Sequence, residues 1–345
     1  MSKTRVGIIN VTGYVGIELA RLLCRHPGIE LVSVTGRSAA GQKLGKFFPH
    51  LAGLNMTIEP KLGDVELAFS AMPHGESAAE IIPLIERGLK VVDMSGDFRL
   101  KNAAEWQLWY GHAHAAPDLL EKAIYGIPEL HRKAISKTQL VANPGCYSTG
   151  AILALVPAAT AGLTEPDIIV DSKSGVSGAG RALKLNSHFC EVDEDVCAYA
   201  VEGHRLMPEM VQEVGIACKG TIPKITFMPH LIPMNRGILS ACYATLKMDK
   251  IPGNNPGEYI KKVYQDFYAN EPFVRVVDDP PHTKQVQGSN YCHIYTTVDS
   301  RTDKLIILSV IDNLGKGAAG QGVQNMNVML GLPETMGLDA PALYP

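Results

Sequence analysis

One cysteine lies where the chain changes from a short apolar run to a long helical pattern. Cys146 follows Asn143-Pro144-Gly145, which comes after the apolar run 140–142, and the helical pattern begins near Ser148. A thiol at a strand end that faces the first turn of a helix lies beside unpaired backbone N–H groups and the positive end of the helix dipole. Both favour the thiolate, which is the nucleophilic form of cysteine. We therefore predict that Cys146 is a catalytic nucleophile rather than a packed core cysteine.

Acid–base chemistry beside such a thiol needs a side chain that gains and loses a proton near neutral pH. Histidine, with an ordinary pKa of ~6.5, is the usual residue for this task. The main candidates are His74, His188, His204 and His230. The residue types alone leave the choice among them open.

The N-terminal residues have the pattern of a dinucleotide-binding turn. An apolar run at 6–9 leads into a turn and then into an amphipathic helical pattern, and Asn10 occupies the position of the usual first glycine. In this order a pyrophosphate can lie against backbone N–H groups at the helix N-terminus. Asparagine tolerates a positive φ better than other non-glycine residues, so the turn can form. The residues expected to contact the cofactor here are Thr12, Gly13, Tyr14, Val15 and Gly16.

The end of the second expected strand indicates which cofactor fits. A site for NAD would show Asp or Glu there, bonded to the ribose 2′-hydroxyl. The sequence is Thr35-Gly36-Arg37-Ser38, in which Arg37 and Ser38 can hold a 2′-phosphate by charge-assisted hydrogen bonds. We therefore expect NADP(H) as the cofactor, with a solvated surface arginine as the alternative interpretation of Arg37.

Size and composition describe an ordinary soluble protein. The chain has 345 residues, enough for two domains, with 46% hydrophobic and 19% charged residues. A net charge of −3 argues against a nucleic-acid or membrane surface. No apolar run approaches the ~20 residues of a membrane span, and the first residues lead directly into a strand pattern, so we expect a cytoplasmic location. The seven cysteines are scattered and form no Cys-x-x-Cys pair, so we expect neither a disulfide framework nor a metal site.

The order of the patterns along the chain predicts an α/β protein with two domains. Up to about residue 145, apolar runs alternate with helical patterns, as in βαβ units of a parallel sheet. We assign 1–145 to a Rossmann-type dinucleotide-binding domain. After a helix near 148–161 the pattern is rich in strands, with one clear helical stretch at 256–268. We assign 146–312 to an α+β catalytic and dimerisation domain with a mostly antiparallel sheet, and expect 313–345 to return and complete the first domain.

Several stretches along nearly the whole chain, taken together, carry a family resemblance. They are Thr12-Gly13-Tyr14-Val15-Gly16, Met72-Pro73-His74-Gly75, Asp93-Met94-Ser95-Gly96-Asp97-Phe98-Arg99-Leu100, Tyr125-Gly126-Ile127-Pro128-Glu129, Asn143-Pro144-Gly145-Cys146, Asp171-Ser172-Lys173-Ser174-Gly175-Val176-Ser177-Gly178-Ala179-Gly180-Arg181, Glu202-Gly203-His204-Arg205, Pro229-His230-Leu231-Ile232-Pro233-Met234-Asn235-Arg236-Gly237 and Asp312-Asn313-Leu314-Gly315-Lys316-Gly317-Ala318-Ala319-Gly320-Gln321. In this order they closely resemble the N-acetyl-γ-glutamyl-phosphate reductases of arginine biosynthesis, which are similar to aspartate-semialdehyde dehydrogenases.

The resemblance implies a reaction and assigns roles. An acyl phosphate is reduced to an aldehyde with release of phosphate, through a thioester on Cys146 and hydride from NADPH. It favours His204 among the histidines as the acid–base partner. It implies that Arg99 binds phosphate, that Ser174 and Gly175 contact the substrate, and that Gly315 and Lys316 close over the nicotinamide. Further expected contacts are Asn143 and Arg205 for the substrate, and Pro73 and Asn313 for the cofactor. It also implies a homo-oligomer with a small-molecule substrate.

Two positions depart from the family pattern. Asn10 replaces a glycine in the cofactor turn, and Leu206 stands where the family often has a second histidine after His204-Arg205. Neither departure touches Cys146. A second histidine therefore cannot be essential in this chain.

Three alternatives to this function remain at the level of sequence. The sister enzyme of lysine biosynthesis performs almost the same chemistry on an aminoadipyl phosphate bound to an acidic carrier protein. Aspartate-semialdehyde dehydrogenase is disfavoured by the stretches 125–129 and 174–180. A non-catalytic NADP-binding sensor would have lost its nucleophile motif, whereas Cys146 and its flanking residues are intact.

Overall fold

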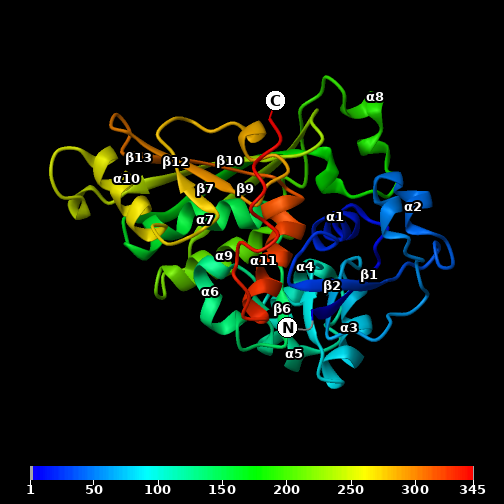
Figure 1. Cartoon of the computed structure of the whole chain (residues 1–345). Helices are drawn as coiled ribbons and strands as arrows, with labels where there is room; N and C mark the ends of the chain where they lie inside the picture. The colour runs from blue at the N-terminus through cyan, green and yellow to red at the C-terminus, as the bar shows by residue number, and fades with distance from the viewer. Residues whose placement is uncertain (1–2, 345) are drawn as a thin grey trace. The chain divides into compact units, whose positions relative to one another are not determined.

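The chain folds into two compact units in the computed structural model, which describes residues 3–344 (Figure 1). The first unit contains the chain up to Pro144 together with Gly180–Ala182 and Ala318–Ala340. The second unit contains Gly145–Ala179, Leu183–Gly317 and the last residues from Pro341. The chain therefore enters the second unit directly before Cys146 and leaves it after Gly317.

The first unit is built on a parallel sheet with the strand order β2-β1-β3-β4-β6-β5. Its strands are β1 (Thr4–Ile9), β2 (Ile29–Val34), β3 (Leu67–Ser70), β4 (Lys90–Asp93), β5 (Ile124–Tyr125) and β6 (Leu140–Ala142). The chain passes from β1 to β2 on one side and then to β3 on the other side of β1. In such open sheets, ligands bind at this switch point, beyond the carboxyl ends of the strands. The predicted Rossmann-type architecture is confirmed.

Helices connect these strands, as the alternating sequence pattern predicted. They are α1 (Tyr14–Leu23), α2 (Leu44–Phe47), α3 (Ser77–Glu86), α4 (Ala103–Tyr110), α5 (Pro117–Lys122) and α6 (Pro128–Ile135), and the unit also contains α11 (Gly320–Met329) from the end of the chain. Apolar residues of β3, α3, β4 and β6 pack with Phe98 and Trp106 in one core cluster. The helix α4 has a sequence-encoded start, because the side chain of Asn102 accepts hydrogen bonds from the backbone N–H groups of Ala104 and Glu105.

A buried polar network ties the ends of β3 and β4 to the start of α3. Asp93 is fully buried, and its carboxylate accepts hydrogen bonds from Ser77 Oγ at 2.6 Å and Ser95 Oγ at 2.8 Å. Ser77 Oγ lies 2.7 Å from Ser70 Oγ. Asp97 accepts from the backbone N–H groups of Gly75 and Ala78. The loops after β3 and β4, which lie at the edge where a cofactor is expected, are thereby held together.

The second unit contains a mixed sheet with the order β11-β12-β13-β10-β7-β9-β8. Its strands are β7 (Thr164–Gly175), β8 (Cys197–Ala198), β9 (Lys224–Ile232), β10 (Ile238–Leu246), β11 (Val274–Val276), β12 (Cys292–Asp299) and β13 (Lys304–Ile311). The pairs β11–β12 and β7–β9 are parallel, and the other neighbours are antiparallel. The predicted mostly antiparallel sheet is therefore confirmed.

The expectation of one clear helical stretch among these strands was wrong. Besides α10 (Pro256–Phe267) and α7 (Cys146–Thr160), which were both predicted, the second unit contains the short α8 (Phe189–Val192) and α9 (Met207–Ala217). The sequence of α9 includes Val211, Val214 and Gly215, which are poor helix formers by intrinsic propensity. Its packing against α7 and β9 overrides that weak preference.

The helix α7 is the central helix of the second unit. Residues 147–159 are all buried, so the helix is apolar on every side and lies in the interior. It packs against β10, β13, α9 and α10. The hydroxyl groups of Tyr264 and Tyr268 donate to the carbonyls of Ala154 at 2.7 Å and Leu153 at 2.6 Å. The position of α7, and with it Cys146, is fixed by the core.

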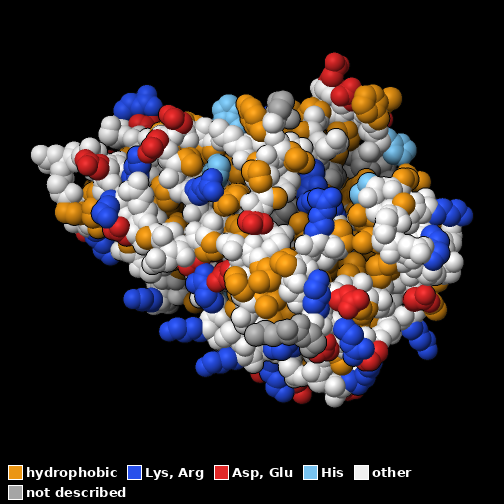
Figure 2. Space-filling view, in the orientation of Figure 1, with side chains coloured by type: hydrophobic (Ala, Val, Ile, Leu, Met, Phe, Trp, Pro, Cys, Tyr) orange, Lys and Arg blue, Asp and Glu red, His pale blue; other side chains and the backbone are white. Residues whose placement is uncertain are grey.

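The surface carries charges of both signs. On the face shown in Figure 2, Lys and Arg side chains are interspersed with Asp and Glu side chains. Within residues 3–344, no helix combines the length and the apolar character that crossing a membrane requires.

We predict that Asp93 makes stability fall as pH rises. Burial and the negative charge of Asp97 raise the pKa of Asp93 to about 6, against hydrogen bonds from Ser77 and Ser95 that lower it. Between pH ~4 and ~6 the folded carboxyl keeps a proton that the unfolded chain has lost, so the free energy of unfolding decreases through this window. The contribution is on the order of 1–3 kcal/mol.

Urea unfolding of wild type and Asp93→Asn at several pH values between 4 and 7 measures this effect. The stability difference between wild type and variant should shrink toward high pH. The exposed Asp118→Asn variant is the control and should keep a constant difference from wild type. A wild-type-to-Asp93→Asn difference that does not depend on pH would contradict the prediction.

Candidate active site

The predicted nucleophile is the first residue of the buried helix α7. The helix begins at Cys146, two residues before the predicted start, and Gly145 is its N-cap with extended backbone (φ −68°, ψ 151°). The thiol is half-buried. The backbone N–H of Gly145 donates to Glu209 Oε2 at 3.0 Å. Cys146 therefore lies at the positive end of a helix dipole, as expected, with a carboxylate close by that the sequence did not predict.

A turn from the far end of the second unit packs directly against Cys146. Residues Gly315–Ala319 form a π-helical turn, a distortion often found at functional sites. A Cβ added to Gly317 would lie 2.9 Å from the Cβ of Cys146 and 3.2 Å from the carbonyl oxygen of Asp312. Glycine at 317 is therefore required for the close approach of this turn to the nucleophile.

His204 lies in an aromatic box on the same unit. Its ring is close to those of Tyr147, Tyr199 and Phe227, with centroid distances of 5.8, 5.6 and 5.4 Å, all edge-on. Burial and, to a lesser extent, the positive charge of Arg205 lower the pKa of His204 to about 4. The imidazole is therefore neutral at physiological pH.

The backbone of Leu206 connects His204 to the nucleophile's helix. Its N–H donates to His204 Nδ1 at 3.1 Å, so the neutral ring carries its proton on Nε2. Its carbonyl accepts a hydrogen bond from Ser148 Oγ at 3.2 Å. Only backbone atoms of Leu206 take part, so these two bonds do not require a histidine side chain at this position.

Two tyrosines extend the box by a chain of hydrogen bonds. Tyr199 OH donates to Tyr147 OH at 3.2 Å, and Tyr147 OH donates to the carbonyl of His230 at 3.0 Å. Burial raises the pKa of Tyr199 to about 12, and a negative charge on Cys146 contributes to the rise. Both tyrosines therefore remain protonated hydrogen-bond donors. His230 itself contributes its backbone here, while its ring lies 3.2 Å from Asp171.

Ser174 and Gly175, predicted substrate contacts, end strand β7. Ser174 is buried, and its Oγ donates to the carbonyl of Gly175 at 3.0 Å. A hydrogen bond from Ser174 also lowers the pKa of Tyr147, against the stronger opposing effect of burial. A Cβ at Gly175 would lie 2.8 Å from the backbone of Met234 and Asn235. Ser174 is therefore adjacent to the aromatic box, whereas Gly175 allows close strand packing.

Asp312 organises the loop that contains Asn313, Gly315 and Lys316. It is fully buried and accepts hydrogen bonds from Arg236 Nε at 2.9 Å and from the backbone N–H groups of Leu314 and Gly315. Asn313 is buried and bonds to Gly237 N at 2.8 Å and Ser177 Oγ at 2.9 Å.

Lys316 lies in the interior of the second unit. Its side chain is fully buried, and its ammonium lies 5.7 Å from the ring centroid of Phe273. It therefore stabilises the turn beside Cys146 from within the second unit by a cation–π contact.

The glycine turn of the first unit has the geometry expected of a dinucleotide site. Asn10 adopts φ 63°, which confirms that asparagine supplies the positive φ of the missing glycine, and its side chain donates to the carbonyl of Ala71 at 2.9 Å. A Cβ on Gly13 would meet no described atom within 4 Å, so space is open at the N-terminus of α1. A Cβ on Gly16 would lie 2.7 Å from Asn10 O, so only glycine fits there. Thr12 lies in the turn, and Tyr14 and Val15 are the first two residues of α1.

Arg37 and Ser38 follow β2 and are exposed, at the same edge of the first unit. The guanidinium of Arg37 forms an ion pair with Glu76, which follows β3. Arg181, from the segment Gly180–Ala182, donates to the carbonyl of Thr12 at 3.1 Å and lies 4.9 Å from the centroid of Phe48. Glu76 and Arg181 are charged residues at the cofactor edge that sequence analysis did not assign.

The other predicted residues of the first unit lie in loops that follow its strands. Pro73 is exposed after β3. Arg99 is buried and donates from Nε to the carbonyl of Asn143 at 2.7 Å and from Nη2 to that of Met94 at 2.9 Å. The amide of Asn143 bonds to Ala318 O and Asn325 Nδ2. Arg99 and Asn143 thus also have a structural role, which is to connect the loops after β4 and β6.

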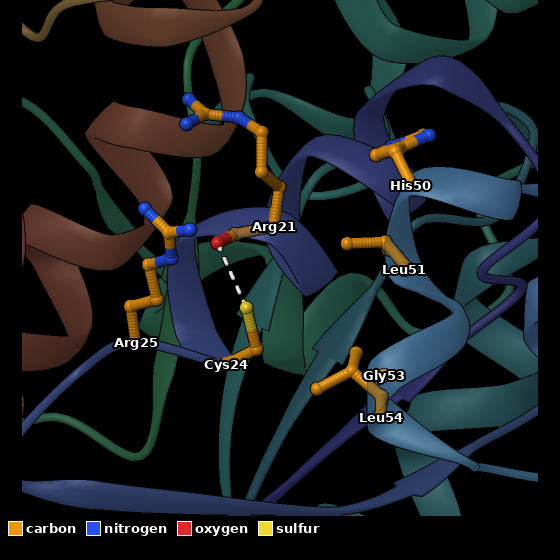
Figure 3. A pocket seen from close by; sticks show the side chains of 7 residues that line it. All are labelled: Arg21, Cys24, Arg25, His50, Leu51, Gly53 and Leu54. Atoms are coloured by element: carbon orange, nitrogen blue, oxygen red, sulfur yellow. Dashed lines mark hydrogen bonds between the residues drawn. The ribbon is translucent and has the colours of Figure 1, made fainter.

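A pocket of about 330 Å³ lies at the opposite end of α1 from the glycine turn (Figure 3). It is lined by Arg21, Cys24, Arg25, His50, Leu51, Gly53 and Leu54. Cys24 Sγ donates to the carbonyl of Arg21 at 3.2 Å, and the arginine side chains point away from His50 and the two leucines. None of the predicted site residues lines this pocket. Basic residues at a helix C-terminus are explained by the helix dipole.

The predicted residues fall in both units. The second unit contains Cys146, Ser174, Gly175, His204, Arg205, Asn313, Gly315 and Lys316. The first unit contains the predicted residues of the glycine turn together with Arg37, Ser38, Pro73, Arg99 and Asn143. The residues that sequence analysis missed, chiefly Glu209, Tyr199 and Asp312, act through contacts between distant segments. Only the position of Asp312 within a quoted motif could have drawn attention to it.

Comparison with known proteins agrees with this arrangement. Residues 5–138 match the family model "Semialdehyde dehydrogenase, NAD binding domain", and residues 146–313 match "Semialdehyde dehydrogenase, dimerisation domain". Solved structures with the same fold include an aspartate semialdehyde dehydrogenase from Candida albicans with NADP (TM-score 0.71, 16% identity, 95% of this chain and 99% of that chain). Another is aspartate semialdehyde dehydrogenase II from Vibrio cholerae (TM-score 0.69, 17% identity, 96% and 99%). The fold and site are those of an oxidoreductase of the semialdehyde dehydrogenase class.

Full-length relatives show to which family within this class the chain belongs. A protein of Dehalococcoides mccartyi named N-acetyl-gamma-glutamyl-phosphate reductase is 55% identical over 346 residues, with 100% of both chains covered. One of the same name from Moorella thermoacetica is 46% identical, with 99% of both chains covered. This chain belongs to the N-acetyl-γ-glutamyl-phosphate reductase family.

We predict that Gly317→Ala disturbs the nucleophile. The added methyl would press on the Cβ of Cys146 and on the Asp312 carbonyl, so the thiol must move. A displacement near 1 Å can cost about 100-fold in rate, so we expect alkylation of Cys146 by iodoacetamide and turnover to fall by roughly 10- to 100-fold. Gly257→Ala in α10, whose added Cβ meets only Asn255 Oδ1 at 3.7 Å, is the matched control. Wild-type alkylation kinetics in Gly317→Ala would contradict the prediction.

We also predict that His204 stays neutral far below the ordinary range of histidine. Its lowered pKa, about 4, implies that the folded state does not bind a proton where the unfolded chain does. Between pH ~6.5 and ~4 this group therefore makes stability fall as pH falls. NMR of ¹⁵N-histidine-labelled protein, assigned with His204→Asn, should show an Nε2–H tautomer and no titration of this ring near pH 6.5. A midpoint near 6.5 would show the prediction to be wrong.

Proposed function

We propose that this protein reduces N-acetyl-γ-glutamyl phosphate to N-acetylglutamate 5-semialdehyde and phosphate, with NADPH as the reductant, as a step of arginine biosynthesis. The observation that carries this proposal is the 55% identity, over the full length of both chains, to a relative of that name. The position of Cys146 at the start of α7, close to the His204 turn, supports it.

The first half of the reaction requires the thiolate of Cys146. Its sulfur forms a bond to the acyl carbon, the bond from that carbon to the phosphate oxygen breaks, and phosphate leaves with the electron pair. The product is a thioester on Cys146. The N-terminal end of α7 favours the thiolate, and the turn at Gly317 limits where the sulfur can lie.

The second half returns the enzyme to its starting state. NADPH, when bound, supplies a hydride to the thioester carbonyl carbon. Negative charge develops on the carbonyl oxygen, and His204 can donate its Nε2 hydrogen to that oxygen, because its Nδ1 already accepts from Leu206. As the carbonyl reforms, the carbon–sulfur bond breaks and the thiolate is released, while His204 keeps its Nε2 proton throughout.

The neutral state of His204 favours this donor role. An imidazolium that holds the resting thiolate as an ion pair would need a pKa above neutral, whereas burial in the aromatic box lowers the pKa to about 4. We therefore assign His204 as the partner of Cys146 that stabilises the oxyanion by a hydrogen bond from Nε2. Arg205 and Ser174, near this box, are the best candidates for contacts to the substrate in the second unit.

The first unit fits a nicotinamide dinucleotide at its glycine turn. Open space at Gly13 and the helix start at Tyr14 suit a pyrophosphate, and Pro73 lies in the neighbouring loop after β3. We assign Arg37 and Ser38 to the 2′-phosphate of NADP(H). Arg37 also forms an ion pair with Glu76. We keep Arg99 and Asn143 as substrate candidates and Asn313, Gly315 and Lys316 as residues that support the nicotinamide side.

The carrier-linked lysine enzyme is the less favoured alternative. The full-length relatives carry the name of the arginine enzyme, and their identity to this chain reaches 55%. A non-catalytic sensor is disfavoured because the nucleophile, its helix and the aromatic box are all present.

We further infer a homo-oligomer in the cytoplasm. The family model of the second unit is described as a dimerisation domain. No disulfide joins the seven cysteines, all of which lie within the described part of the chain, as suits a reducing compartment. Light scattering of the purified protein tests the assembly.

The decisive assay is the reverse reaction, in which purified protein receives N-acetylglutamate semialdehyde, phosphate and either NADP or NAD. We expect phosphate-dependent reduction of NADP, weaker reduction of NAD, and a loss of at least about 10³-fold in Cys146→Ser because the hydroxyl is a far weaker nucleophile and leaving group. Cys24→Ser, at a free cysteine in the first unit, is the matched control and should retain activity.

Two results would contradict the proposed function. One is turnover that does not need phosphate, and the other is full activity in Cys146→Ser. Turnover of a carrier-bound acyl phosphate alone would move the assignment to the lysine enzyme.

A further inference from the structure

A buried carboxylate lies at the N-terminus of the nucleophile's helix. Glu209 is 0% exposed, in the first turn of α9, and its Oε2 accepts from the backbone N–H of Gly145 at 3.0 Å. Gly145 directly precedes Cys146. A buried charge is costly unless it is hydrogen-bonded, and here the first turns of α7 and α9 both favour a negative charge. Glu209 thus lies, like the thiolate, at helix N-termini whose dipoles favour a negative charge.

Glu209 belongs to a set of hydrogen bonds that join the two catalytic segments. The His204 turn leads directly into α9, and Leu206 binds both His204 Nδ1 and Ser148 Oγ. The bond between Glu209 and Gly145 closes this set on the other side of Cys146. The backbone at Cys146 is therefore fixed relative to the His204 turn before and after the nucleophile.

The charge of Glu209 also acts on the thiol. The other titratable or charged groups on elements packed around Cys146 are Tyr147 on α7, Tyr199 after β8, His204 and Arg205 before α9, and Lys316 in the π-helical turn. His204 is neutral, and both tyrosines are protonated because burial raises their pKa values. Arg205 is exposed, and Lys316 is buried against Phe273. Asp312, before the π-helical turn, is also buried but is paired with Arg236, whereas the Glu209 carboxyl bonds at the N-terminus of α7 itself.

We propose that Glu209 is a positioning residue for the nucleophile. Its carboxylate holds the start of α7 against the His204 turn and places a negative charge beside the thiol, which keeps the thiolate basic and hence strongly nucleophilic. This inference rests on the proposed function, in which Cys146 attacks the acyl phosphate. It adds a residue that acts through Gly145 rather than by contact with the substrate.

The same helix offers a matched control. Glu213 lies one turn after Glu209, is also buried, and accepts from Gln212 Nε2 at 2.8 Å. Replacing either glutamate by glutamine removes one buried charge from α9. Only the change at 209 removes it from the N-terminus of α7.

The test is the pH dependence of Cys146 alkylation by iodoacetamide, measured by mass spectrometry of the Cys146 peptide, together with steady-state kinetics. In Glu209→Gln the amide oxygen can still accept from Gly145, but the charge is gone. We expect the alkylation midpoint to move down by about one pH unit. A less basic thiolate is a poorer nucleophile, so at a pH above both midpoints, where Cys146 is fully ionised in either protein, kcat should fall by about threefold with little change in KM. Glu213→Gln should keep the wild-type midpoint.

A wild-type midpoint in Glu209→Gln, or an equal shift in Glu213→Gln, would overturn the proposal. Alkylation needs no substrate, so it reports on Glu209 even if the assay for the proposed function fails. If Glu209→Gln does not fold, the Glu209→Asp variant provides the test of the proposal instead. It keeps the charge but withdraws the carboxylate by one methylene, so we expect a wild-type midpoint with reduced kcat, and a wild-type kcat would overturn the positioning role.

Discussion

The N-terminal turn of α7 is the feature on which the catalytic half of this protein depends. The helix is buried along residues 147–159, so its position is set by close packing in the core of the second unit. Cys146 is the first residue of this helix and is therefore held rigidly as well. Hydrogen bonds from Gly145 to Glu209 and from Ser148 to Leu206 then fix the neighbouring turn against it. A nucleophile on a core helix is held more firmly than one on a surface loop.

The environment of His204 follows from the same packing. Aromatic rings of Tyr147, Tyr199 and Phe227 exclude water from the imidazole, and this desolvation disfavours the charged form. Tyr147 contributes to the box because it follows Cys146 on α7. The core that positions the nucleophile therefore also determines the protonation state of its partner.

At the two positions where this chain departs from the family pattern, the backbone provides what the site needs. Leu206 uses its N–H and carbonyl, so a histidine is not required at this position. Asn10 reaches φ 63° in place of a glycine, and its amide adds a bond to Ala71. Both departures are tolerated because the backbone conformation, rather than the side chain, is what each site needs.

Sequence by itself determined the Rossmann-type first unit, the mostly antiparallel second sheet, the start of α7 within two residues, and the family with its reaction. These follow from local periodicity, glycine positions and motifs that retain their spacing. It did not reveal α9, in which Val211, Val214 and Gly215 weaken the helix propensity, or the roles of Glu209, Tyr199 and Asp312. Those depend on contacts between segments tens of residues apart, as between Gly145 and Glu209. Only the tertiary structure could decide them, because burial, which sets the charge state of His204, and long-range hydrogen bonds exist only once the chain has folded.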